Sequence, residues 1–195
     1  MEIPDKRKEI LINTREEWRE WLKNFYQSEP SVWIICNTKK SGLPAVDWGD
    51  LVEEALCFGW IDSTRKTINE GSFKQLFSKR KPGSTWSRIN KEKVQKLIDA
   101  GLMTESGHEC IRVAKENGSW TILDTVEDLI VPEDLTEAFK AYAGSEDYFK
   151  SLSKSMKKMM LQWIVLAKRP ETRKKRIDEI VENAAQGKKP KHFLS

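Results

Sequence analysis

The side chains best suited to binding or catalysis lie between Ala55 and Asn90, where aromatic, acidic, basic and hydroxyl residues occur close together. The middle of this stretch has the pattern of a β-hairpin. Successive side chains of a strand point to opposite faces of the sheet. Trp60 and Asp62 are therefore expected on one face and Arg65 on the other. Arg80 follows the second strand, which returns beside the start of the first. We therefore expect Asp62 and Arg80 to be neighbours.

An arginine beside a carboxylate can hold an anion, because its guanidinium donates two parallel hydrogen bonds to a carboxylate or phosphate. Trp60 and Trp86 would form the floor of such a pocket, and a helix that starts near Asn90 would add backbone N–H donors. The predicted ligand-binding residues are Trp60, Asp62, Arg80, Ser84, Trp86, Ser87 and Asn90. A structural ion pair with core tryptophans and a capped helix fits the same residues, so both interpretations stay open.

Glu54 and Asp62 are the carboxylates that could supply acid–base chemistry, which makes an enzyme the alternative to a binding protein. No catalytic residue is assigned. Glu53 and Glu54 are adjacent on a predicted helix and point about 100° apart, so they cannot form a carboxylate pair. Cys57 has apolar neighbours on both sides and no histidine nearby, which favours a packed core thiol over a nucleophile.

The cysteines and histidines predict neither a disulfide framework nor a metal site. Cys36, Cys57 and Cys110 are far apart and form no CxxC pair, and His108 and His192 are the only histidines. Carboxylate ligands for magnesium or calcium show no motif. We therefore expect reduced thiols, no metal and no cofactor.

The net charge is +4, but two basic blocks stand against an acidic remainder. Residues 65–96 hold ten lysines and arginines against two glutamates, and residues 150–176 hold ten against one. These blocks predict an anionic partner, either a small anionic ligand or an acidic protein, although solvated faces give the same pattern. The block 150–176 is an alternative surface for nucleic acid or another acidic surface. Specific nucleic-acid recognition is not expected, because no helix-turn-helix, KH or RNP signature is present.

The pattern of expected helices and strands that carry these residues predicts an α+β fold that is predominantly helical. A small antiparallel or mixed sheet, with a strand at 32–37 and a hairpin at 60–80, is packed by helices. We expect an α+β domain over residues 1–130, which carries the candidate site. A helical C-terminal half over 131–187 packs on it as one unit, and residues 188–195 form a flexible tail.

No apolar run approaches the length of about 20 residues that a membrane-spanning helix needs. The N-terminus lacks the apolar segment of a secretory signal. We therefore expect a cytoplasmic protein, and the sequence does not predict its oligomeric state.

Four blocks, CFGWID, RKPGSTWSRIN, VPEDL and AKRPETRKKRI, occur in this order along the chain. Through them the sequence resembles, over nearly its whole length, the YdeI/OmpD-associated (OmdA) family, often labelled bacteriocin-protection proteins. The resemblance implies a small bacterial protein without an agreed enzymatic activity, acting in bacteriocin defence or stress resistance. It carries the family's pattern onto Glu54, Cys57, Gly59, Trp60, Asp62, Arg80, Pro82, Ser84, Trp86, Ser87 and Asn90. The loop Gly83-Ser84-Thr85 departs from that pattern, because the family has charged or larger residues there.

Overall fold

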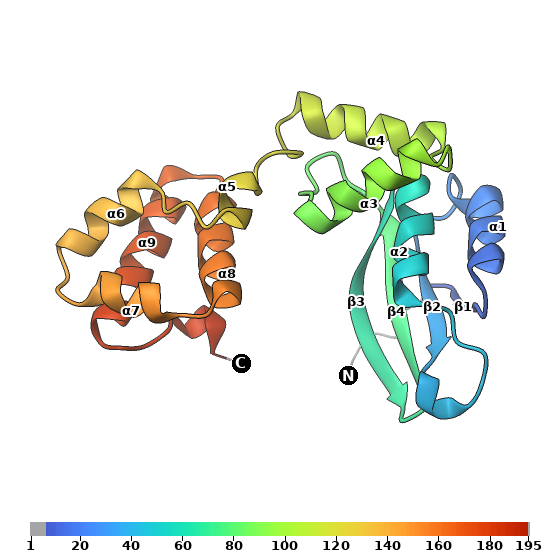
Figure 1. The fold of residues 1–195 in the computed structure, drawn as a ribbon, viewed down its shortest axis with the longest axis horizontal. Helices are drawn as coiled ribbons and strands as arrows, with labels where there is room; N and C mark the ends of the chain where they lie inside the picture. Colours follow the sequence, from blue (N-terminus) through green and yellow to red (C-terminus); the bar gives the residue numbers. More distant parts are fainter. Residues whose placement is uncertain (1–6, 195) are drawn as a thin grey trace. The chain divides into compact units, whose positions relative to one another are not determined.

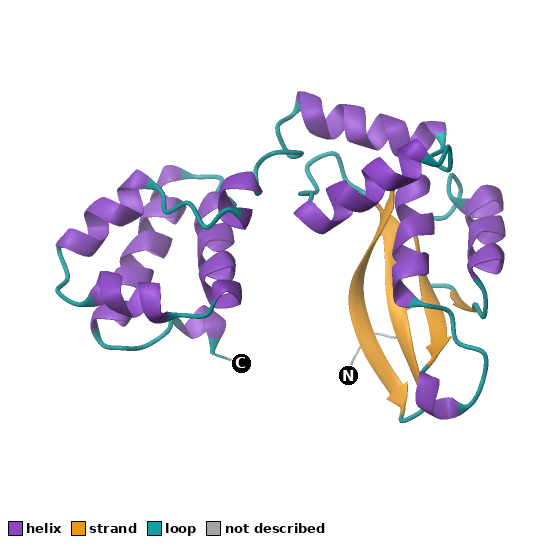
Figure 2. Cartoon of the chain, viewed as in Figure 1, coloured by secondary structure: helices purple, strands orange, loops and turns teal. Residues whose placement is uncertain are grey.

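The computed structural model describes residues 7–194 and divides into two compact units, one ending at Trp120 and the other beginning at Thr121 (Figure 1). The first unit combines a four-stranded sheet with helices, and the described residues of the second are helices and connecting loops (Figure 2). The predicted α+β class, with a predominance of helix, is confirmed.

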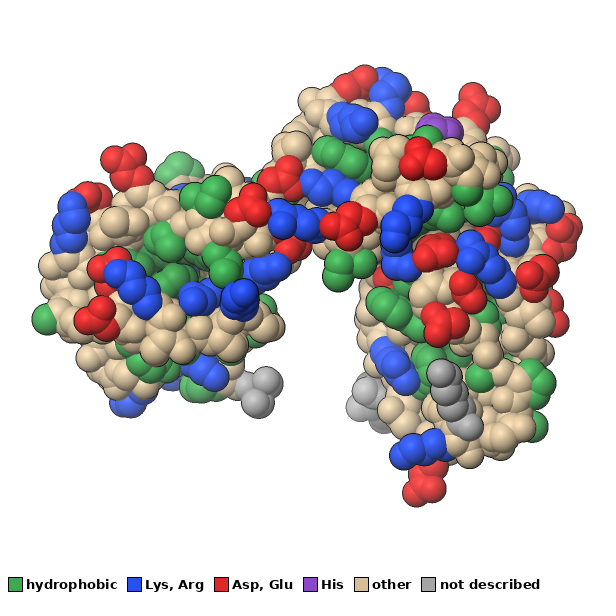
Figure 3. Space-filling view, in the orientation of Figure 1, with side chains coloured by type: hydrophobic (Ala, Val, Ile, Leu, Met, Phe, Trp, Pro, Cys, Tyr) green, Lys and Arg blue, Asp and Glu red, His purple; other side chains and the backbone are tan. Residues whose placement is uncertain are grey.

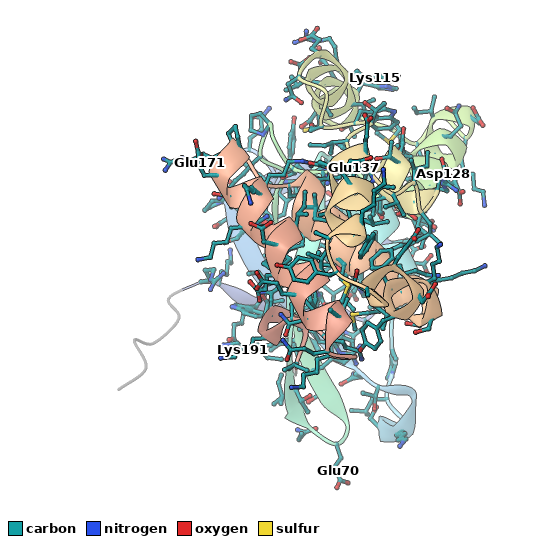
Figure 4. All side chains as sticks on the ribbon, turned by 90° about the vertical axis from the view of Figure 1, so that its left-hand side faces the viewer. Glu70, Lys115, Asp128, Glu137, Glu171 and Lys191 are labelled. Atoms are coloured by element: carbon teal, nitrogen blue, oxygen red, sulfur yellow. The ribbon has the colours of Figure 1, made fainter. Side chains whose placement is uncertain are left out.

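The sheet of the first unit is mixed. It is built from β1 (Glu9–Leu11), β2 (Ser31–Asn37), β3 (Trp60–Asn69) and β4 (Ser72–Lys79), in the order β1-β2-β4-β3. β1 runs parallel to β2, and the other neighbouring strands are antiparallel. The predicted strand and hairpin are both present, with Glu70 at the hairpin turn (Figure 4). β1 has three residues, which is too short for a strand period to be visible in the sequence.

A β-bulge in β3 changes the face that its later side chains occupy. Asp62 is paired with Phe77 but Arg65 with Gln75, so three steps along β3 match two along β4. Arg65 therefore lies on the same face as Asp62, and the prediction that it points to the other face is wrong. Its guanidinium carbon is 3.6 Å from the ring centre of Phe73, which belongs to the core of this unit.

Within the described residues, four α-helices supply the rest of this core. They are α1 (Arg15–Phe25), α2 (Trp48–Cys57), α3 (Arg88–Asp99) and α4 (Glu105–Glu116), with a 3-10 turn at Lys39–Ser41. Each α-helix begins at a threonine, aspartate or serine whose side chain accepts a hydrogen bond from a backbone N–H of the first turn. Their apolar stripes and the sheet form one hydrophobic cluster. It includes the fully buried Trp18, Leu22, Leu51, Trp60 and Phe77.

The second unit is a set of short helices around its own core. They are α5 (Asp124–Glu127), α6 (Glu133–Lys140), α7 (Ser145–Ser151), α8 (Lys154–Val165) and α9 (Pro170–Ala185), followed by a 3-10 turn at Lys191–Phe193. The core includes Leu135, Phe139, Phe149, Met160 and Ile180. Where the sequence predicts a flexible tail, Pro190 is buried and the ring of His192 stacks on Trp163 at 4.9 Å.

Candidate functional site

A cavity of about 720 Å³ lies in the first unit, near the junction of α2 with β3 and the end of β4. The aromatic part of its wall is Tyr26, Phe58 and Trp60, and the basic part is Lys79, Arg80 and Arg112. The first two turns of α4 complete the wall. The volume is within the range of small-molecule sites, roughly 300–1,000 Å³.

Gly59 allows α4 to approach the junction of α2 with β3 closely. Its φ is +73°, and a Cβ at this position would lie 2.6 Å from the Sγ of Cys110. The hydroxyl of Thr104 donates to the carbonyl oxygen of Cys57 at 2.6 Å, and the hydroxyl of Ser106 donates to the next carbonyl at 3.1 Å. These hydrogen bonds fix the first turn of α4, so the positive end of its helix dipole borders the cavity.

Arg80 is held with most of its guanidinium unpaired. Its Cζ is 3.6 Å from the ring centre of Trp86, and its Nη2 donates to the carbonyl oxygen of Thr85 at 3.0 Å. Within the described residues, Nε and Nη1 make no hydrogen bond, and no carboxylate lies within 4.0 Å of the guanidinium. Burial lowers the pKa of Arg80 to about 10, so the side chain remains a cation at neutral pH.

Trp60 supplies a second unpaired donor. Its side chain is fully buried, and its Nε1–H has no acceptor among residues 7–194. In the part of the chain that the structure describes, Trp60 Nε1 and Arg80 Nε are the two buried side-chain polar atoms without a hydrogen-bond partner, and both residues line this cavity. Buried donors are nearly always paired, because an unpaired one costs about 1–3 kcal/mol. Both atoms have less than 1 Å² of exposed surface, so an acceptor from outside the chain would reach them only after a movement of the cavity wall.

The structure brings three of the seven predicted site residues together. Trp60 and Arg80 line the 720 Å³ cavity, and Arg80 and Trp86 border a smaller one of about 90 Å³. Asp62 lines neither cavity. The side-chain amide of Gln75 donates to it at 3.5 Å, and burial raises its pKa. Asp62 acts on Arg80 only as a longer-range charge, without the ion pair that would orient the guanidinium.

The other three predicted residues, Ser84, Ser87 and Asn90, also lie outside both cavity walls. The Oγ of Ser84 accepts from the backbone N–H of Lys81 at 3.1 Å and so closes a turn. The Oγ of Ser87 accepts from the backbone N–H of Asn90 at 3.3 Å, as the N-cap of α3. These groups therefore shape the chain locally.

The sequence pattern did not indicate the part of the cavity wall that α4 supplies. Ser106 and Cys110 are far from the hairpin in sequence, and nothing in their spacing connects them with Arg80. One signal was available in Gly107, which stands in the first turn of α4. A Cβ there would overlap the carbonyl oxygen of Cys57. A glycine in a helix can therefore indicate close packing against another segment.

Glu54, a candidate for acid–base chemistry, is engaged in an ion-pair cluster and does not line the cavity. Its carboxylate accepts from Arg15 Nε at 2.6 Å and from Arg19 Nη1 at 2.5 Å, and its exposed fraction is 2%. Cys57 is fully buried, and burial raises the pKa of its thiol to about 11. Among the described residues, no group of three or more His, Cys, Asp or Glu could hold a metal ion.

The described helices include none that is both long and apolar enough to cross a membrane. No curated protein and no solved structure matches the chain. Two family models do match. The model described as "Domain of unknown function (DUF8412)" covers residues 10–110, and the model described as "Bacteriocin-protection, YdeI or OmpD-Associated" (OmdA) covers residues 128–187.

The sequence resembles the OmdA family through four blocks, and these blocks fall in two different family matches. The resemblance is confirmed for the blocks VPEDL and AKRPETRKKRI, which lie in the OmdA match, whereas CFGWID and RKPGSTWSRIN lie in the other. The candidate site thus falls outside the OmdA segment. The chain belongs to the family of the domain of unknown function DUF8412, whose model covers just over half of it, and its second unit carries an OmdA segment.

Proposed function

We propose that this protein binds a small anionic ligand, a carboxylate or a phosphate, in the 720 Å³ cavity of its first unit, with Arg80 as the main anchor. The observation that carries the proposal is the pair of buried donors, Trp60 Nε1 and Arg80 Nε, that lack an acceptor. A ligand oxygen would remove the cost of leaving them unpaired. A bacteriocin-protection role, as in the name of the OmdA family, is the biological setting that we propose for this binding.

The charges of the cavity wall support an anionic ligand. Arg80 has no carboxylate partner within the described residues, and Lys79 adds a second cation. The wall also contains two carboxylates: Glu109 is paired with Arg112 at 2.6 Å, whereas Glu105, in the first turn of α4, is exposed to solvent and has no ion pair within the described residues. The first turn of α4 adds a partial positive charge, which is favourable for carboxylates and phosphates.

The aromatic wall indicates that the ligand has a flat or apolar part besides its anionic group. The rings of Tyr26 and Phe58 lie 5.4 Å apart, and both line the cavity together with Trp60. Apolar walls with a few well-placed polar groups are typical of small-molecule sites. Benzoate and inorganic phosphate are therefore suitable probes, because the first combines a ring with a carboxylate and the second tests the anion alone.

The test is isothermal titration calorimetry of the full chain with each probe, for the wild type, Arg80→Met and Arg112→Met. Hydrogen bonds to a charged group contribute about 1.5–3 kcal/mol, so Arg80→Met should raise the Kd of benzoate about 10- to 100-fold. Arg112→Met is the matched control, because this arginine lines the same cavity but is already paired with Glu109 and Glu116. Arg112→Met also leaves the Glu109 carboxylate without this ion pair at the cavity wall, and because the pair is exposed we expect an effect of only about threefold.

Stability separates a binding role of Arg80 from a structural one. Because Arg80 makes no ion pair with any residue that the structure describes, Arg80→Met should change the free energy of unfolding by less than about 1 kcal/mol. The proposal is wrong if Arg80→Met keeps the fold, by circular dichroism, and binds both probes as the wild type does. A glutamate-rich peptide that binds through Arg80 when neither probe does would instead indicate an acidic protein partner.

A further inference from the structure

A second cavity, in the unit that begins at Thr121, is enclosed mainly by apolar side chains. Its volume is about 210 Å³, and its wall comes from α6, α7, α8 and the segment after α5. The apolar side chains are Leu129, Val131, Phe139, Phe149 and Leu161. The last three are at most 5% exposed, so the cavity reaches the core of this unit. An engineered cavity of about 150 Å³ in another protein holds benzene, so this one has room for about six to eight carbons.

Leu129 contributes to this wall from a strained backbone conformation. Its φ is 56°, and among the described residues it is the one non-glycine residue with a positive φ. It follows α5, where the N–H of Ile130 donates to the carbonyl oxygen of Thr125 at 2.8 Å. Glycine is usual at this position of a helix end, because it adopts a positive φ without strain. The leucine side chain packs in the cavity wall and against the adjoining core, which a glycine at this position could not do.

Two lysines border the same cavity. The Nζ of Lys157 on α8 donates to the carbonyl oxygen of Lys150 on α7 at 3.1 Å. Lys150 is paired at 2.8 Å with Glu146, a carboxylate that also lines the cavity, so this pair is neutral and Lys157 is the cation in excess. Residues 150–176 hold ten lysines and arginines against one glutamate. Figure 3 shows lysine and arginine side chains beside hydrophobic ones on the surface of this unit. Over residues 121–195, fourteen lysines and arginines stand against twelve aspartates and glutamates, so the surplus of positive charge is local to 150–176.

From the apolar interior and the basic border together, we propose that the second unit binds a small amphipathic carboxylate of about six to eight carbons. Its hydrocarbon part occupies the 210 Å³ cavity, and its carboxylate lies at Lys157, which has no carboxylate partner within the described residues. Burial of the hydrocarbon part drives binding, and Lys157 selects the charge. This site shares no residue with the cavity at Arg80.

The test uses the full chain, octanoate and its neutral analogue octanamide, with dissociation constants from titration calorimetry. Exposed ion pairs are weak, so we expect octanoate to bind about fivefold more tightly than octanamide. In Lys157→Gln this preference should disappear. Lys154→Gln is the matched control, because Lys154 lies on α8 without bordering the cavity.

Filling the cavity should abolish binding without removing charge. Val131→Phe places a ring in the wall and should weaken octanoate binding at least about tenfold, since the hydrocarbon part loses its space. If that variant does not fold, Thr136→Phe, at an exposed position of α6 on the same cavity, serves instead. Because octanoate also has the chemistry proposed for the first cavity, these titrations are made in the Arg80→Met background, which weakens that site and leaves the wall of the 210 Å³ cavity intact.

Three results would overturn the proposal. One is the absence of octanoate binding at millimolar concentrations, and another is equal binding of octanoate and octanamide. The third is octanoate binding by a folded cavity-filling variant with the affinity of the wild type.

Discussion

Arg80 combines burial, which opposes its charge, with an aromatic contact that keeps the guanidinium in place. The ring of Trp86, 3.6 Å from Cζ, attracts the cation and offsets part of the cost of burial, a cost that also lowers the pKa of this side chain. The guanidinium is thereby oriented while two of its three nitrogens have no hydrogen bond within the described residues. A ligand that binds there does not have to order the arginine first.

Cys36 and Cys57 should make the stability of the protein fall at alkaline pH. Both side chains are fully buried, and burial raises the pKa of each thiol from 9.0 to about 11. Between these two values the unfolded chain has lost the thiol proton and the folded chain has kept it. The free energy of unfolding therefore falls as the pH rises through this window, by about 1.4 kcal/mol per pH unit for each thiol.

The comparison of Cys57→Ala with the wild type measures one of these contributions. Denaturant unfolding in reducing buffer should show a slope against pH that is shallower in the variant by about 1.4 kcal/mol per pH unit, above the unfolded thiol pKa only. At neutral pH the variant is expected to be less stable, because the missing sulfur leaves a small cavity. Lysines and tyrosines titrate in both proteins and cancel. Parallel curves would contradict the assigned burial of the thiol.

At the level of single residues, the sequence could predict Trp60, Arg80 and Trp86 because strand parity and the position of a loop are local properties. It could not separate a ligand-binding hydroxyl from a capping one. Ser87 precedes a helix, where a serine side chain is equally suited to either role, and the structure shows that it caps α3. Only the distance of a hydroxyl from a cavity decides between the two.

At the level of elements, the packing of α4 against α2 is set by Gly107. A Cβ at this position would overlap the carbonyl oxygen of Cys57 and lie 3.0 Å from its carbonyl carbon, and neither backbone atom can turn aside. Alanine stabilises a helix by about 1 kcal/mol relative to glycine, but overpacking costs about 1–3 kcal/mol. We expect Gly107→Ala to lower the free energy of unfolding by about 1–2 kcal/mol, measured by denaturant titration.

Gly83→Ala is the control for this substitution. A Cβ at Gly83 would have no atom within 4 Å, and the residue does not need a positive φ. The free energy of unfolding of the Gly83→Ala variant should differ from that of the wild type by less than about 0.5 kcal/mol. Because α4 forms part of the cavity wall, Gly107→Ala should also weaken benzoate binding, whereas Gly83→Ala should not. Equal stability of the two variants would mean that α4 can move away from α2 without cost.

The elements themselves could be predicted where a period was long enough to be visible. β2 was predicted because its residues form a short apolar run rich in β-branched side chains, and the hairpin of β3 and β4 because turn residues separate two strand-like segments. The bulge after Asp62 was not, because the extra residue has strand-like composition and the pairing partner decides which residue is extra. The position of α4 was missed for a similar reason, since contacts between distant segments leave no periodic pattern.

At the level of the whole molecule, the two compact units coincide with the two family matches. Residues 10–110 lie in the unit that ends at Trp120, and residues 128–187 lie in the unit that begins at Thr121. Each described unit also has its own hydrophobic cluster and its own cavity. The order of sequence blocks could indicate a relationship over the whole chain, but it could not indicate that two families meet within it.

Separate hydrophobic cores predict that each unit folds on its own, because cooperative unfolding extends over residues that share a core. The fragment 121–195 should show helical circular dichroism and one cooperative thermal transition. The fragment 1–120 should bind benzoate with the Kd of the full chain within about twofold, since the whole wall of the 720 Å³ cavity lies inside it.

The fragment 141–195 is the control for this division, because it lacks Leu135 and Phe139 of the second core and should not unfold cooperatively. A fragment 121–195 without a cooperative transition would show that its core depends on the first unit. A fragment 1–120 that folds but loses benzoate binding would show that the second unit contributes to the anion site. The two outcomes concern different cores, so either expectation can be contradicted while the other holds. Together the two fragments test whether each unit is independent of the other.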